Sequence, residues 1–218
     1  MSSAGSLSAA TRVFLGTVII LLGLLLLAGA WSIPFTFESS SILYKFGMEK
    51  TYLRSGKVVG VTIALLVFYQ VILASRFAVF EQVFSAKRIF FLHRCNGIAI
   101  TCLIVLHPLL IKASESFTPY TFEKKYYPEF LGITVLAVLL LLSLTAIFRN
   151  FLKLPYTRWL ILHRVLATLA LVLMPAHILY VSETFKQGIP RQAVLVIWGL
   201  NLFIITAVWL RRLSGKNR

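Results

Sequence analysis

The sequence contains no aspartate, only two cysteines and no glycine-rich nucleotide motif. Without a G-x-G-x-x-G or Walker-type loop, nothing in the chain predicts a nucleotide site. Cys95 and Cys102 are seven residues apart in one apolar stretch. A helix would hold them about 10 Å apart, which is too far for a disulfide. We therefore expect two free thiols that act as small packing residues.

Acidic residues are scarce as well. The chain carries seven acidic residues against 22 lysines and arginines, and its formal charge is +15. The basic residues lie between apolar stretches and not on one face or tail, so they read as topogenic signals and anionic-lipid contacts instead of a nucleic-acid surface. Hydrophobic residues make up 59% of the chain, above the roughly 45 to 50% of a soluble domain. This composition excludes a soluble protein.

Six apolar stretches have about the 20 residues needed to cross a bilayer. They are residues 13–31, 58–77, 89–111, 130–148, 159–181 and 193–210. Ala28-Gly29-Ala30 resembles a signal-peptide cleavage site, but the apolar run before it is longer than a usual signal peptide's, which favours a retained span. The sequence predicts an all-α, polytopic membrane helical bundle of about six transmembrane helices, forming a single domain over residues 1–218.

Basic residues at the ends of the predicted spans indicate the orientation. With the N-terminus inside, 13 of the 22 lysines and arginines lie on the inner side, and six of the seven glutamates lie outside. We expect a multi-pass protein of the cell (inner) membrane with both termini cytoplasmic.

All four histidines fall within the third and fifth predicted spans, and none lies in a loop. Ionisable side chains are costly in lipid and usually mark a functional site inside the bundle. His93 and His107 are 14 residues apart, as are His163 and His177. Fourteen residues of helix rise about 21 Å and return to nearly the same face. Each helix therefore presents two imidazoles on one face, near opposite edges of the membrane.

The third and fifth spans are separated by one other span, so they cross the membrane in the same direction. His93 then lies at the same membrane level as His163, and His107 at the same level as His177. Two imidazoles from facing helices suit the axial ligation of a haem iron, so the spacing predicts two haems about 20 Å apart along the helix axis. A single zinc site is disfavoured because the two pairs are too distant to form one tetrahedral shell. For one histidine alone, an interhelical hydrogen bond would be the simpler explanation.

A local repeat supports this pairing. Phe91-Leu92-His93-Arg94 recurs as Ile161-Leu162-His163-Arg164 at an offset of 70 residues. Guanidinium groups bind carboxylates as charge-assisted forks, which makes Arg94 and Arg164 candidates for the propionates of the inner haem. Snorkelling towards the inner surface explains the two arginines equally well.

These residues resemble the ferric reductase-like transmembrane domain of ferric reductases and NADPH oxidases. The likeness rests on LHR-x12-HP at Leu92 to Pro108 and LHR-x12-H at Leu162 to His177. It implies two b-type haems, with His93 and His163 on the inner iron and His107 and His177 on the outer. It also implies electron transfer from a cytoplasmic donor, a flavoprotein or quinol, to an outer acceptor such as ferric iron, dioxygen or a redox protein.

Flavin and nicotinamide domains are not found in this sequence, so the resemblance implies that FAD and NAD(P)H act through a partner, if at all. We expect an oxidoreductase membrane component that needs a partner dehydrogenase, with the lipid bilayer and the redox proteins as partners. A similar relative is the haem-binding membrane subunit of the periplasmic methionine sulfoxide reductase system. That subunit typically lacks the ligand equivalent to His93, which is present here.

Two interpretations from other classes remain. The histidines would act as a proton relay in a small transporter, or the chain would be a membrane scaffold. Relays usually mix histidine with acidic residues inside the membrane, whereas the six predicted spans contain none.

Overall fold

The computed structural model describes residues 7–38 and 46–214, which form helices and no strand. Residues 1–6, 39–45 and 215–218 lie outside this description. The α-helices are α1 (Ala9–Thr36), α2 (Gly47–Ser75), α3 (Ala78–Phe84), α4 (Ala86–Ser114), α5 (Tyr127–Ile147), α6 (Tyr156–Val181) and α7 (Gly188–Leu213). Two short 3-10 turns, η1 (Lys124–Tyr126) and η2 (Glu183–Phe185), precede α5 and α7.

In the described part of the chain, six helices are long and apolar enough to cross a membrane, as the sequence predicted. They are α1, α2, α4, α5 with its preceding turn, α6 and α7. All six helices begin before the predicted spans, most of all α2, which begins at Gly47 instead of residue 58. Helices α2 and α5 end slightly early, at Ser75 and Ile147 instead of residues 77 and 148. Hydropathy marks the part of a helix that crosses lipid, whereas backbone hydrogen bonds carry the helix on into the polar flanks. The chain is an integral, multi-pass membrane protein.

Local signals set several helix ends. The Ser8 hydroxyl accepts a hydrogen bond from the Thr11 amide at 3.1 Å and caps α1, as polar N-cap residues do. Arg76 ends α2 in the left-handed conformation, with φ at 51°. The short α3, which the sequence analysis did not predict, fills the connection from α2 to α4.

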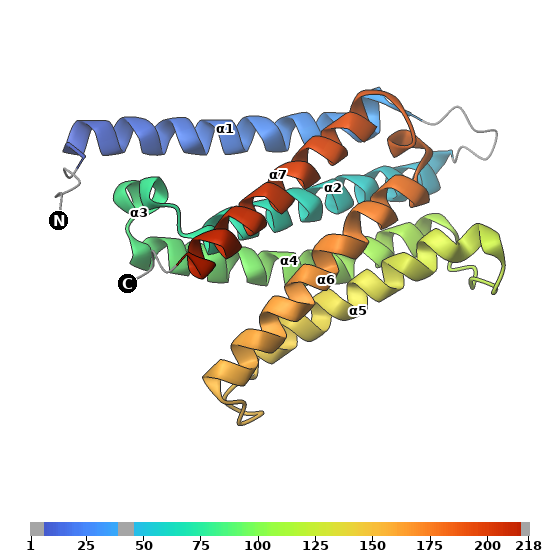
Figure 1. Ribbon diagram of the computed structural model, residues 1–218. Coiled ribbons are helices and arrows are strands. Elements are labelled where there is room, and N and C mark those ends of the chain that lie inside the picture. The colour runs from blue at the N-terminus through green and yellow to red at the C-terminus, as the bar shows by residue number, and fades with distance from the viewer. Residues whose placement is uncertain (1–6, 39–45, 215–218) are drawn as a thin grey trace.

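The helices pack as two antiparallel pairs, α2 with α4 and α5 with α6. Figure 1 shows α4 and α6 running in the same direction, with the α5–α6 pair inclined to the α2–α4 pair. Helix α1 lies along α2, and α7 contacts both α2 and α6. The parallel course of the third and fifth spans is therefore confirmed.

The core lies where the two pairs meet. It is apolar and draws on five helices: Ile63, Val67, Ile100, Ile104, Val135, Val138, Leu139, Leu166, Ala170, Leu171, Met174 and Trp198. The outward faces are apolar too, since side chains such as Leu25 are 68% exposed. A long helix that is apolar all round and exposed suits lipid contact.

Some polar groups also join the helices. The Trp31 indole donates to the Thr62 hydroxyl at 2.8 Å, which ties α1 to α2. The Thr101 and Ser143 hydroxyls lie 2.9 Å apart and tie α4 to α5. Such hydrogen bonds stabilise helix association in lipid, where the hydrophobic effect cannot.

The two cysteines are free, as predicted, but both are exposed on α4 instead of packed between helices. Because α4 also carries buried faces, only the tertiary packing determines which side of the helix meets the surface. Asn201 of α7 is fully buried, and neither atom of its amide has a partner within the described residues.

Candidate functional site

The four histidines lie within the two parallel helices. His93 and His107 belong to α4, and His163 and His177 belong to α6. All four side chains are partly buried. Within the described residues, the ring hydrogen bonds of these histidines involve Nδ1, and none reaches Nε2.

The structure brings the histidines together in the predicted pairs. The imidazoles of His93 and His163 lie within electrostatic range of each other, as do those of His107 and His177. We call them the inner pair and the outer pair, after the predicted orientation. Helices α4 and α6 make no extensive contact with each other, and each packs on its own antiparallel partner.

The outer histidines are held by backbone carbonyls of the neighbouring helices. Nδ1 of His107 lies 2.9 Å from the Gly56 carbonyl oxygen on α2, and Nδ1 of His177 lies 3.0 Å from the Pro128 carbonyl oxygen on α5. A carbonyl oxygen only accepts hydrogen bonds, so Nδ1 donates in both cases. The lone pair of each ring is then left on Nε2.

The inner histidines are held differently. Nδ1 of His93 and Nδ1 of His163 are buried, and neither has a partner in the described part of the chain. The His93 backbone carbonyl accepts from the Gln70 amide at 2.9 Å. Asn96 in turn donates to Gln70 Oε1 at 2.6 Å and to the Leu66 carbonyl at 2.8 Å. This polar network fixes α4 against α2 at the depth of His93.

His163 lies against an aromatic side chain. Its ring centroid is 5.2 Å from that of Trp159, with an interplanar angle of 39°. The Arg149 guanidinium lies 5.6 Å from the Trp159 ring, within the distance of a cation–π contact. The buried Trp159 indole N–H has no partner among the residues described.

Arg94 and Arg164 follow the inner histidines and are exposed. In the described residues neither forms an ion pair, and Arg164 acts electrostatically on His163. The guanidinium groups are therefore not engaged by a carboxylate of this chain in residues 7–38 and 46–214.

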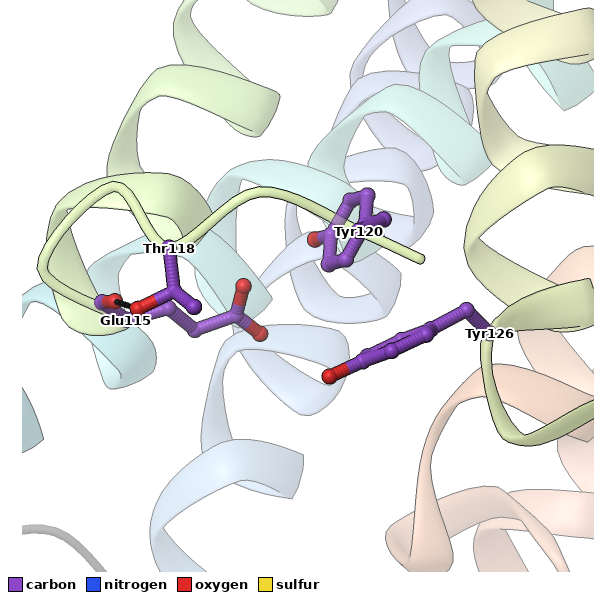
Figure 2. Close-up of a pocket in the computed structure, with 4 residues that line it drawn as sticks. All are labelled: Glu115, Thr118, Tyr120 and Tyr126. Atoms are coloured by element: carbon purple, nitrogen blue, oxygen red, sulfur yellow. Dashed lines mark hydrogen bonds between the residues drawn. The ribbon is translucent and has the colours of Figure 1, made fainter. Parts of the chain in front are cut away.

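A polar hollow of about 270 Å³ lies beyond the C-terminal end of α4, the end of the helix that carries His107. Glu115, Thr118, Tyr120 and Tyr126 line it (Figure 2). The Thr118 hydroxyl donates to the Glu115 backbone carbonyl at 2.8 Å. The Lys112 ammonium lies 3.2 Å from the Glu115 carboxylate and 3.5 Å from the Tyr120 ring centroid.

Burial and the neighbouring Glu115 carboxylate raise the pKa of the Tyr120 phenol above its ordinary value of 10.0. The phenol therefore stays neutral at physiological pH. It offers the hollow a hydrogen-bond donor beside a carboxylate.

The groups that surround the histidines were not predicted from the sequence. Gly56 and Gly60 form a small-xxx-small motif, a common signal of close helix packing in membranes, and both positions touch α4 side chains. Gln70 and Asn96 are amides inside apolar spans and were detectable on that ground. No local pattern marked the Pro128 carbonyl, because its role depends on how α5 meets α6.

The comparisons with known proteins give one match. The family model described as ferric reductase like transmembrane component matches residues 59–174, more than half of the chain. No curated protein matches, and no solved structure matches. The matched segment contains three of the four histidines and ends three residues before His177. With six membrane-spanning helices and this match, the chain belongs to the family of ferric reductase-like transmembrane components, membrane proteins of electron transfer.

Proposed function

We propose that the protein binds two b-type haems, one at each histidine pair, and passes single electrons from a cytoplasmic donor to an outer acceptor. The observation that carries this proposal is the pairing itself. Four imidazoles from two parallel helices form two pairs, and no described residue forms a hydrogen bond with Nε2 of any ring. His93 and His163 would hold the inner haem, and His107 and His177 the outer.

The site fits such a group in three respects. The helices that supply the ligands pack on other partners and make no extensive contact with each other. Backbone carbonyls hold the outer rings with the lone pair on Nε2. Apolar core residues such as Ile104 and Met174 lie on α4 and α6 between the two pairs and exclude water.

When bound, haem iron supplies a one-electron redox couple. The chain supplies ligation, orientation and a dry environment. The 14-residue spacing sets the two pairs about 21 Å apart along the helix axis. Arg94 and Arg164 are exposed and unpaired with any described carboxylate, which leaves them available to the propionates of an inner haem.

The outer acceptor would meet the protein near the polar hollow, which lies beyond the end of α4 that carries His107. Its carboxylate, hydroxyl and phenol groups favour a small polar acceptor or a polar surface of a redox protein. The donor would be a flavoprotein or quinol at the opposite end, with both chain termini in the cytoplasm.

The test is a dithionite-reduced minus oxidised absorption spectrum of the detergent-purified protein, with a pyridine haemochrome assay that counts haem per chain. We expect two b haems. His93→Ala and His163→Ala should each lose the same component in a potentiometric titration, and His107→Ala and His177→Ala the other.

Full haem content in all four single variants would end the proposal. One haem per chain in the unaltered protein would contradict the two-haem reading and favour a subunit of the methionine sulfoxide reductase type. A colourless protein, purified after expression with ample haem, would favour a transporter or scaffold.

A further inference from the structure

Each outer histidine rests on a glycine of the neighbouring helix, one turn after the carbonyl that it contacts. His107 donates to the Gly56 carbonyl and lies on Gly60, and His177 donates to the Pro128 carbonyl and lies on Gly132. The two arrangements come from different helix pairs, yet both place the carbonyl four residues before the glycine.

Gly132 leaves no room for a side chain, and Gly60 leaves very little. A Cβ atom on Gly132 would lie 2.5 Å from Cε1 and 2.9 Å from Nδ1 of His177. A Cβ atom on Gly60 would lie 3.0 Å from Cε1 and 3.3 Å from Nδ1 of His107. Separations under 3.0 Å essentially never occur for real Cβ atoms, so an alanine at position 132 must displace the imidazole, whereas one at position 60 is marginal.

We call the backbone carbonyl and the glycine that each outer histidine contacts the cradle of that ring. The cradle determines which ring nitrogen carries the proton. With the proton fixed on Nδ1 by the carbonyl, the lone pair is on Nε2 and the ring plane is held. The inner histidines have no such carbonyl in the described residues, since Nδ1 of His93 and His163 is unpartnered there. The cradle therefore belongs to the outer pair alone.

We propose that Gly60 and Gly132 are positioning residues of the outer histidine pair. Because they lack a side chain, His107 and His177 reach the Gly56 and Pro128 carbonyls, which fix the Nδ1–H tautomer and present Nε2. The identity of the group that Nε2 binds rests on the proposed function, whereas the tautomer does not.

The hydrogen bond also has an electronic consequence. A histidine that donates its second N–H to a carbonyl is a more basic ligand. A more basic ligand stabilises the ferric state and lowers the reduction potential. Loss of the cradle should therefore raise the potential of the outer haem and leave the inner haem unchanged.

The first experiment needs no haem. Haem-free protein labelled with ¹⁵N-histidine reports the tautomer of each imidazole by NMR, and single His→Gln variants assign the four signals. We expect His107 and His177 as Nδ1–H tautomers, and loss of this state for His177 in Gly132→Ala. A predominant Nε2–H tautomer of both outer rings in the unaltered protein would overturn the proposal.

The second experiment compares glycine variants of the haem-loaded protein. Gly199→Ala on α7 is the control, because nothing lies within 4 Å of an added Cβ there. Gly132→Ala should bind haem at the outer site about tenfold more weakly or worse, the usual scale for loss of a group that orients a ligand. Gly60→Ala should have a smaller effect in the same direction, and Gly199→Ala none.

Size-exclusion profiles show whether each variant folds, and if Gly132→Ala does not, Gly60→Ala and the tautomer measurement decide. If both cradle variants match Gly199→Ala in haem content and in both midpoint potentials, the glycines have no positioning role. If even the unaltered protein binds no haem, the proposed function fails while the tautomer measurement still tests the cradle.

Discussion

The indole of Trp159 lies against the imidazole of His163, one helical turn further along α6, with 5.2 Å between ring centroids. Arg149, from the connection before α6, covers the Trp159 ring at 5.6 Å. The inner histidine of α6 is therefore oriented by an aromatic contact, whereas the outer histidine of the same helix is oriented by a carbonyl.

Truncation of this aromatic side chain should disturb the inner pair alone. We expect Trp159→Ala to weaken haem retention at the His93–His163 site, because the His163 ring loses the surface that restricts its rotation. Trp159→Phe should retain most of the binding. Haem content and a two-component potentiometric titration measure the effect, and Trp209→Ala, an exposed position on α7, is the control. Equal loss at both sites would show a general destabilisation instead.

Arg94 and Arg164 test the proposed propionate contacts. In Arg94→Gln and Arg164→Gln we expect a lower potential of the inner haem, because a nearby positive charge favours the reduced form. The outer haem should be unaffected, because the two histidine pairs are about 21 Å apart along the helix axis. Arg158→Gln is the matched control for a positive charge on the same helix as Arg164. Unchanged inner potentials in both variants would leave the arginines with a purely topogenic role.

Asn201 offers a stability prediction. Its amide is fully buried without a partner among the described residues, and an unpaired buried polar group costs about 1–3 kcal/mol. Asn201→Leu, which is similar in size, should therefore raise the thermal unfolding temperature in detergent. A lower unfolding temperature of Asn201→Leu would show that the amide does have a partner in the protein. The haem content of the variant would then show whether that partner lies at the redox site.

The loop after α4 should respond to alkaline pH. Because burial and Glu115 raise the pKa of Tyr120, the folded loop favours the neutral phenol. This contribution to stability is complete below the ordinary value of 10.0 and is lost as the pH rises above it. In a titration followed at 295 nm, Tyr120→Phe should remove absorbance only from the part of the curve above that value. Removal of a component near pH 10 would contradict the structure.

Orientation is open to direct measurement. If both termini are cytoplasmic, a single cysteine at Phe122, which is 94% exposed, should react from the outside with a membrane-impermeant maleimide in a background without Cys95 and Cys102. A cysteine at Phe151, 83% exposed in the connection from α5 to α6, should react only after the membrane is opened. The reverse pattern would invert the proposed direction of electron flow.

The sequence by itself determined the six spans, because the length of an apolar run is a local property that the bilayer thickness makes decisive. It also determined which histidines share a face, since the helical period fixes the angle between residues 14 apart. The parallel course of α4 and α6 followed from the number of spans between them. The resemblance to the family followed from the LHR-x12-H spacing of the histidines.

Tertiary structure alone decided which helix packs on which, and therefore what surrounds each imidazole. Apolar side chains are nearly equivalent towards lipid and towards other helices, so sequence patterns do not fix the register between spans. The Gly56 and Pro128 carbonyls, the contact of Trp159 with His163 and the burial of Asn201 all depend on that register. Close packing at small residues and a few interhelical hydrogen bonds set it, and both exist only once the helices have met.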